Sequence, residues 1–152
     1  MQAQRDELIG LLQSAYWKEI ETVMSYLAGS INPDGVRAQE IRQTLADEVS
    51  DELAHARILG ERINELYGVV PGSCDFAAQQ PYLQPARDQA DLQHVVQGVI
   101  TAENDAIKGY QRIIGFCEGK DPVTQDVVIG ILHDEERHLR LFEGFMREWE
   151  PT

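Results

Sequence analysis

Apolar residues recur at intervals of three and four along most of the chain, which is the spacing of one buried face of an α-helix. Four stretches show this pattern: residues 8–27, 41–66, 92–113 and 122–149. The fourth stretch has Asp121 in the position of an N-cap and Pro122 in the first helical position, where both residue types favour the start of a helix. The pattern therefore predicts four helices.

The connections between these stretches predict how the helices are arranged. Turn signals at residues 32–35 and 119–122 join the first helix to the second and the third to the fourth, and such short turns make antiparallel hairpins. Residues 68–90 are irregular, and about 23 residues can extend over about 70 Å, more than a helix of about 40 Å. We expect an all-α, antiparallel four-helix bundle with one long crossover, forming a single domain over residues 1–152.

The two halves of the chain are related by an internal repeat. A shift of 84 residues places Leu8, Glu19 and Tyr26 on Leu92, Glu103 and Tyr110. A shift of 83 residues places Asp51, Glu52 and His55 on Asp134, Glu135 and His138. Each half therefore carries one helical Glu with a Tyr seven residues later, followed by a helix with an Asp-Glu-x-x-His motif.

The repeated residues have the chemistry of a dinuclear metal site. Glu and His three positions apart lie on one side of a helix, so both can reach the same ion. Glu19 and Glu103 lie on otherwise apolar stripes, where an unpaired carboxylate costs several kcal/mol. Four glutamates supply a charge of −4, which two divalent cations balance, and two imidazoles complete six ligands suited to iron or manganese.

On these motifs the chain resembles the ferritin-like superfamily over its whole length, most closely the bacterioferritin and Dps-like branches. The resemblance implies that Glu52 and Glu135 bridge two metal ions. It implies terminal ligands in two pairs, Glu19 with His55 and Glu103 with His138. The remaining repeated residues would support the ligands: Asp51 and Asp134 by holding the imidazole N–H groups, Tyr26 and Tyr110 as hydrogen-bond donors or one-electron relays.

The resemblance also implies an activity and an assembly. We expect a ferroxidase that binds two iron ions per chain, with manganese or zinc as possible substitutes, and oxidises Fe(II) with O2 or H2O2 for iron storage or detoxification. Bacterioferritins carry a haem-ligating Met where this chain has Leu53, so no haem is expected. The sequence ends at Thr152 without the fifth helix of many ferritins, which favours a homo-oligomer of 12 subunits over one of 24 and leaves smaller assemblies open.

Composition limits the partners. Lys and Arg number 13 against 26 Asp and Glu, a net charge of −13, so we expect no nucleic acid partner, because phosphate binding needs basic surfaces. The polar N-terminus and the lack of an apolar run of about 18 residues predict a cytoplasmic protein without a membrane partner. Some Dps-like proteins with such a site carry a cysteine pair near it, and whether Cys74 and Cys117 form one is left open.

Two other functions are compatible with these motifs. A di-iron oxidase or rubrerythrin-like peroxidase that stores no iron is the main alternative, although the chain lacks a rubredoxin-type CxxC pair. A purely structural bundle, with its carboxylates satisfied by water and Arg, is the third interpretation.

Five polar residues near the motifs are expected outside the ligand set, the glutamates as solvated charges and the histidines at the surface or behind the ligands: Glu21, Glu48, Glu136, His94 and His133.

Overall fold

The computed structural model describes residues 1–151 and contains the four predicted helices. They are α1 (Gln2–Gly29), α2 (Ala38–Glu65), α3 (Leu92–Cys117) and α4 (Pro122–Met146), with short 3-10 turns at Ser73–Asp75 and Arg147–Trp149. The side chain of Asp121 accepts a hydrogen bond from the backbone N–H of Thr124 at 2.9 Å, so the predicted N-cap of α4 is confirmed. Among the described residues there is no β-strand.

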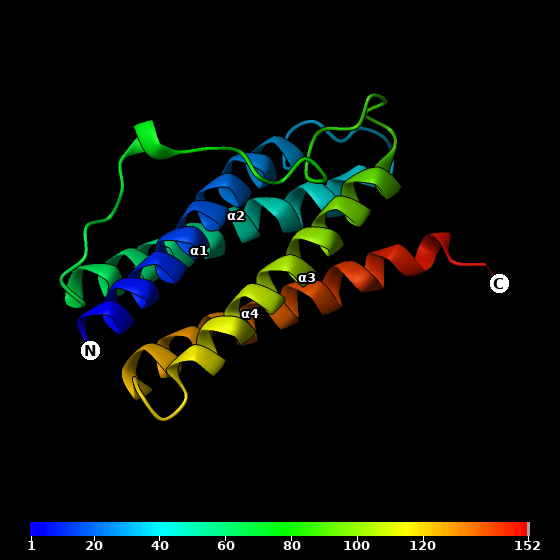
Figure 1. The fold of residues 1–152 in the computed structure, drawn as a ribbon. Helices are drawn as coiled ribbons and strands as arrows, with labels where there is room; N and C mark the ends of the chain where they lie inside the picture. The colour runs from blue at the N-terminus through cyan, green and yellow to red at the C-terminus, as the bar shows by residue number, and fades with distance from the viewer. Residues whose placement is uncertain (152) are drawn as a thin grey trace.

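The helices form two antiparallel hairpins that pack against each other (Figure 1). The crossover, residues 66–91, leaves the end of α2 and passes along the bundle before α3 begins, so α2 and α3 run in the same direction (Figure 1). Gly35 and Gly119 adopt positive φ angles of 110° and 68° in the two hairpin turns, which residues with a Cβ adopt only at a cost. The predicted ferritin-like topology is confirmed.

The apolar core is divided into two clusters at opposite ends of the bundle. One cluster joins the end of α1, the start of α2, the start of α3 and the end of α4, around Tyr26, Leu45, Val96 and Phe142. The other joins the complementary helix ends, around Leu12, Leu59, Ile113 and Val128. The charged residues of the repeat lie between these clusters in sequence on every helix. Helix packing therefore places them in one layer across the middle.

The crossover is attached to α1 by a buried carboxylate. Glu21 is 4% exposed and accepts hydrogen bonds from the backbone N–H groups of Gln79 and Gln80 at 2.7 and 2.8 Å. The prediction that Glu21 is a solvated helix charge is therefore wrong, because a loop far away in sequence folds over it. Gly98 lets α3 approach the same loop, since an added Cβ would lie 2.7 Å from the carbonyl oxygen of Tyr82.

Candidate metal centre

Six side chains from all four helices meet in the middle of the bundle. Each is at most 5% exposed: Glu19 from α1, Glu52 and His55 from α2, Glu103 from α3, and Glu135 and His138 from α4. They form two groups whose potential ligand atoms lie within 4.8 Å of one another. One group contains Glu19 and His55, the other contains Glu103 and His138, and both contain Glu52 and Glu135. The two shared carboxylates are those for which the family resemblance implies a bridging position.

The aspartates of the repeated motif orient the imidazoles across the interface between α2 and α4. Nε2 of His55 lies 2.9 Å from Oδ2 of Asp134, and Nε2 of His138 lies 3.2 Å from Oδ2 of Asp51. Each aspartate thus contacts the histidine of the other helix. A carboxylate at Nε2 favours the N–H there and leaves Nδ1 as the ligand atom. The Nδ1 atoms do face inward, at 3.2 Å from Glu135 for His55 and 3.0 Å from Glu52 for His138.

The two tyrosines form a second set of crossed contacts. The hydroxyl of Tyr26 donates to Oε1 of Glu103 at 2.6 Å, and that of Tyr110 donates to Oε1 of Glu19 at 2.5 Å. Each tyrosine therefore bonds to the glutamate of the opposite helix, although the sequence places it two turns from the glutamate on its own helix. Burial, followed by the charge of the bonded glutamate, raises both tyrosine pKa values well above 10.0. The phenols stay protonated and hold one oxygen of each carboxylate in place.

The metal-free cluster retains protons because it is buried and rich in carboxylates. Burial, with the charge of Glu19, raises the pKa of Glu52 well above its ordinary value, and burial raises that of Glu103 to about 8. Burial alone would lower the pKa values of His55 and His138, but the close carboxylates of the surrounding glutamates outweigh it and raise both. Burial also acts to raise the pKa of Glu135, yet the two imidazoles outweigh this and lower it to about 2.

Several inward-facing atoms of the cluster have no hydrogen-bond partner within residues 1–151. They are Oε2 of Glu19, Oε2 of Glu52, Nδ1 of His55, Oε2 of Glu103 and Oε1 of Glu135. Buried polar atoms are normally paired, so a cluster of unpaired ones needs an explanation such as an ion. Mixed carboxylate and imidazole donors suit iron, manganese or zinc. The donor set therefore fits two divalent cations, each able to reach three glutamates and one histidine.

One carboxylate near the cluster was wrongly predicted to be solvated. Glu48 is 3% exposed, and neither of its side-chain oxygens has a hydrogen-bond partner among the described residues. Burial raises its pKa from 4.5 to about 7, despite the opposing effect of His138. Its position one turn before Glu52 extends the inward stripe of α2 from Ile41 and Leu45, and that spacing was the available signal for its burial.

The other residues near the motifs lie outside this cluster. His94, His133 and Glu136 are exposed, as expected for residues that are not ligands. Both cysteines are free thiols: Cys74 is exposed in the crossover, and Cys117 is buried in the cluster that contains Leu12 and Val128. The structure therefore contains no disulfide between them. None of the helices within residues 1–151 combines the length and the hydropathy that a membrane-spanning segment requires.

The fold and the site define a class: a ferritin-like four-helix bundle with a candidate dinuclear carboxylate–histidine centre. The family model described as Ferritin-like domain matches residues 9–150, so this chain belongs to that family. A sequence relative is the DNA protection during starvation protein of Pyrococcus furiosus, which is 28% identical over 145 residues, covering 93% of this chain and 77% of the relative.

Solved structures share the fold at low sequence identity. A ferritin-like, diiron-carboxylate protein from Bacillus anthracis has a TM-score of 0.84 at 20% identity, covering 96% of this chain and 99% of its own. The bacterioferritin-related protein from Bacteroides fragilis, described as a dodecameric thioferritin, has a TM-score of 0.81 at 24% identity, covering 95% and 86%. A Dps1 mutant from Mycobacterium smegmatis has a TM-score of 0.83 at 16% identity, covering 96% and 99%.

Proposed function

We propose that this chain is a ferroxidase that binds two Fe(II) ions as substrate and acts in iron storage or detoxification. The observation that supports this most strongly is the buried cluster itself. Its two groups share Glu52 and Glu135, and five of its inward-facing atoms make no hydrogen bond within the described residues. Nδ1 of His55 lies 3.2–3.8 Å from oxygens of three glutamates but makes no hydrogen bond to any of them, an arrangement that suits a shared ion better than a hydrogen-bonded ion-pair network.

In this proposal, Glu52 and Glu135 hold both ions, while Glu19 with His55 and Glu103 with His138 complete the two sites. One O2 accepts one electron from each of two Fe(II) ions, together with two protons, and leaves as H2O2. One H2O2 accepts two electrons and two protons in the same way and leaves as two waters. Asp51 and Asp134 keep each imidazole oriented through Nε2. The tyrosine hydroxyls hold Glu19 and Glu103, which limits the reorganisation that binding requires.

We further propose that the chain works as a homo-oligomeric cage, with 12 subunits favoured because the thioferritin relative from Bacteroides fragilis is described as dodecameric. The Pyrococcus furiosus relative is named for DNA protection. With a net charge of −13, this chain is unsuited to coating DNA directly. Removing Fe(II) and peroxide would protect DNA without contact.

The test is aerobic addition of excess Fe(II), followed by size-exclusion chromatography with iron analysis of each fraction. We expect a large particle that retains many irons per chain. A small species that binds about two irons per chain and then stops would contradict storage and favour the non-storage oxidase or peroxidase. Glu52→Ala should abolish rapid Fe(II) oxidation, whereas the same substitution at exposed Glu61 should not. Equal rates in both variants would refute the assigned site.

A further inference from the structure

A small cavity opens between α1 and α3 and reaches the candidate metal centre from outside. It has a volume of about 60 Å³, and its inner lining includes Glu19 and Tyr110, each 3% exposed. Apolar residues Leu11, Ala15 and Ile113 form part of its wall. A cavity needs about 10–15 Å³ on this measure to hold one water. By this measure the space has room for several waters, so a molecule of two heavy atoms fits in it next to a candidate ligand.

The internal repeat places an equivalent cavity at the other tyrosine. This second cavity, also of about 60 Å³, is lined by Tyr26, Ser25, Val95 and Val99, which a shift of 84 residues relates to Tyr110, Gly109, Leu11 and Ala15. We call the cavity at Tyr110 the open cavity and the one at Tyr26 the covered cavity. Two cavities that are equivalent in the repeat can thus be compared directly.

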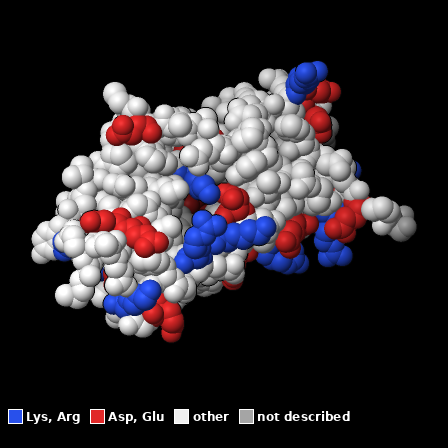
Figure 2. All heavy atoms as spheres, in the orientation of Figure 1, with Lys and Arg blue, Asp and Glu red and all other residues white. Residues whose placement is uncertain are grey.

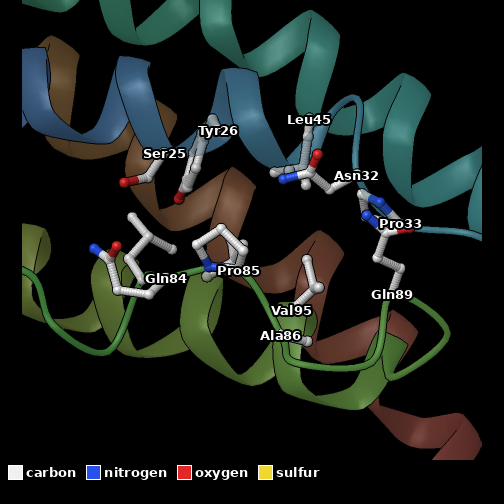
Figure 3. A pocket seen from close by; sticks show the side chains of 13 residues that line it. Ser25, Tyr26, Asn32, Pro33, Leu45, Gln84, Pro85, Ala86, Gln89 and Val95 are labelled. Carbon is white, nitrogen blue, oxygen red and sulfur yellow. The ribbon is translucent and has the colours of Figure 1, made fainter.

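The crossover makes the two cavities different. Leu83, Gln84, Pro85, Ala86 and Gln89 line the covered cavity, and Figure 3 shows this loop running across it. The open cavity has no lining residue from the crossover. At position 109 the repeat has Gly in place of Ser25, and a Cβ added to Gly109 would meet no atom within 4 Å. The crossover therefore contributes to one cavity only, and a candidate ligand, Glu19, lines the open cavity whereas its equivalent, Glu103, does not line the covered one.

The rim of the open cavity carries charges that disfavour a cation. Lys18 forms an ion pair with Asp105, with Nζ 3.0 Å from Oδ2, and Arg112 adds a second, exposed positive charge. Basic and acidic side chains gather side by side near the middle of this face (Figure 2). With Asp105 paired, the rim has a net charge of +1, which opposes a divalent cation and is indifferent to a neutral molecule.

The opposite side of the centre is richer in carboxylates. There the imidazoles are backed by Asp51 and by Asp134, which also pairs with Arg137, and Glu48 lies buried without a hydrogen bond next to exposed Asp47. That side suits Fe(II). We infer that the open cavity is the entry and binding site for the small uncharged oxidant, O2 or H2O2, and that the covered cavity is not. This inference rests on the proposed ferroxidase function.

The test introduces a larger side chain at equivalent positions of the two cavities. Gly109→Leu fills the open cavity, and Ser25→Leu fills the covered cavity as the matched control. Metal-free protein first binds Fe(II) anaerobically and is then mixed rapidly with either O2 or H2O2. We expect Gly109→Leu to lower the oxidation rate about tenfold while Ser25→Leu stays within twofold of the unmodified chain. Gly109→Ala, which adds one carbon in open space, should give an intermediate rate. Slowing with one oxidant alone would assign the cavity to that oxidant.

Four further results separate this inference from the proposed function. Unchanged anaerobic Co(II) stoichiometry in Gly109→Leu will show that the fold and the metal sites survive. Xenon-pressurised crystals of the metal-free chain should contain xenon in the open cavity, and those of Gly109→Leu should not. Wild-type rates in Gly109→Leu, or equal slowing in both Leu variants, would overturn the oxidant entry alone. An unmodified chain that binds Co(II) but never oxidises Fe(II) would overturn the proposed function and this inference with it.

Discussion

Replacing Glu52 with Gln distinguishes a metal site from a structural ion-pair network. Burial and the neighbouring charge of Glu19 raise the pKa of Glu52, so a neutral side chain is easier to bury here than a charged one. Gln has nearly the same shape as a protonated Glu. The free energy of unfolding of the metal-free protein should therefore change by less than about 1 kcal/mol, the size of one ordinary hydrogen bond.

The same substitution should have a large effect once metal is present. Free metal at 100 times its dissociation constant stabilises the folded state by about 2.7 kcal/mol per ion. Glu52 belongs to both ligand groups, so its loss affects two ions and about 5.4 kcal/mol by the same relation. At about 2–4 °C per kcal/mol for a chain of this size, wild-type protein should gain about 11–22 °C in Tm on adding Co(II). Glu52→Gln should lose most of that gain.

The assay is thermal unfolding with and without Co(II) for wild type, Glu52→Gln and Glu61→Gln. Glu61 lies on the same helix but is exposed and pairs with Arg57 at 3.2 Å, so its variant should behave as wild type in both conditions. Breaking a buried ion pair costs about 3–5 kcal/mol. A loss of that size in metal-free Glu52→Gln, with no Co(II) stabilisation of the wild type, would refute the metal-site interpretation.

Three more predictions concern the surroundings of the site. The pKa of Glu48 is raised from 4.5 to about 7, so between these pH values only the folded chain holds this proton and metal-free stability falls as pH rises, by up to about 1.4 kcal/mol per pH unit. Glu48→Gln should flatten that fall in urea titrations at several pH values, and an unchanged slope would contradict the shift. Glu21→Ala removes the acceptor of two crossover N–H groups and should cost about 2–4 kcal/mol in urea unfolding; hydrogen exchange as slow as in wild type in the crossover would argue against this attachment. Gly98→Ala would place a Cβ 2.7 Å from the carbonyl oxygen of Tyr82 and should lower Tm, whereas Gly130→Ala, with no atom within 4 Å, should not; equal Tm values would show that the loop yields.

Much of the candidate site was predictable because helices make distances along the chain regular. Glu52 and His55 lie three residues apart, and the same motif recurs at Glu135 and His138. Once residues of this spacing are helical, they must share a face. The apolar residues around Glu19 and Glu103 then indicate that this face turns inward. The structure brings all four helices together at these residues, as that argument requires.

The burial of Glu21 and Glu48 was not predicted. Glu48 continues the inward stripe of Ile41 and Leu45, which was the available signal, whereas Glu21 has no local mark that separates a buried carboxylate from a solvated one. Glu21 is buried by a loop about 58 residues away in sequence. Glu48 is buried by the packing of its helix in the bundle. The burial of Glu21 depends on the loop that covers it, and local spacing contains no information about that loop.

The sequence alone determined that this protein has four amphipathic helices, one long crossover and a repeated set of carboxylates and imidazoles on their inner faces. Helical periodicity is a local property, which is why these features can be deduced from residue spacing. Only the tertiary structure decided that Tyr26 bonds to Glu103 and Tyr110 to Glu19. It also decided that the crossover covers the cavity at Tyr26 and not the one at Tyr110. These contacts join residues that are distant in sequence, and they depend on which helix lies opposite and on where a loop packs.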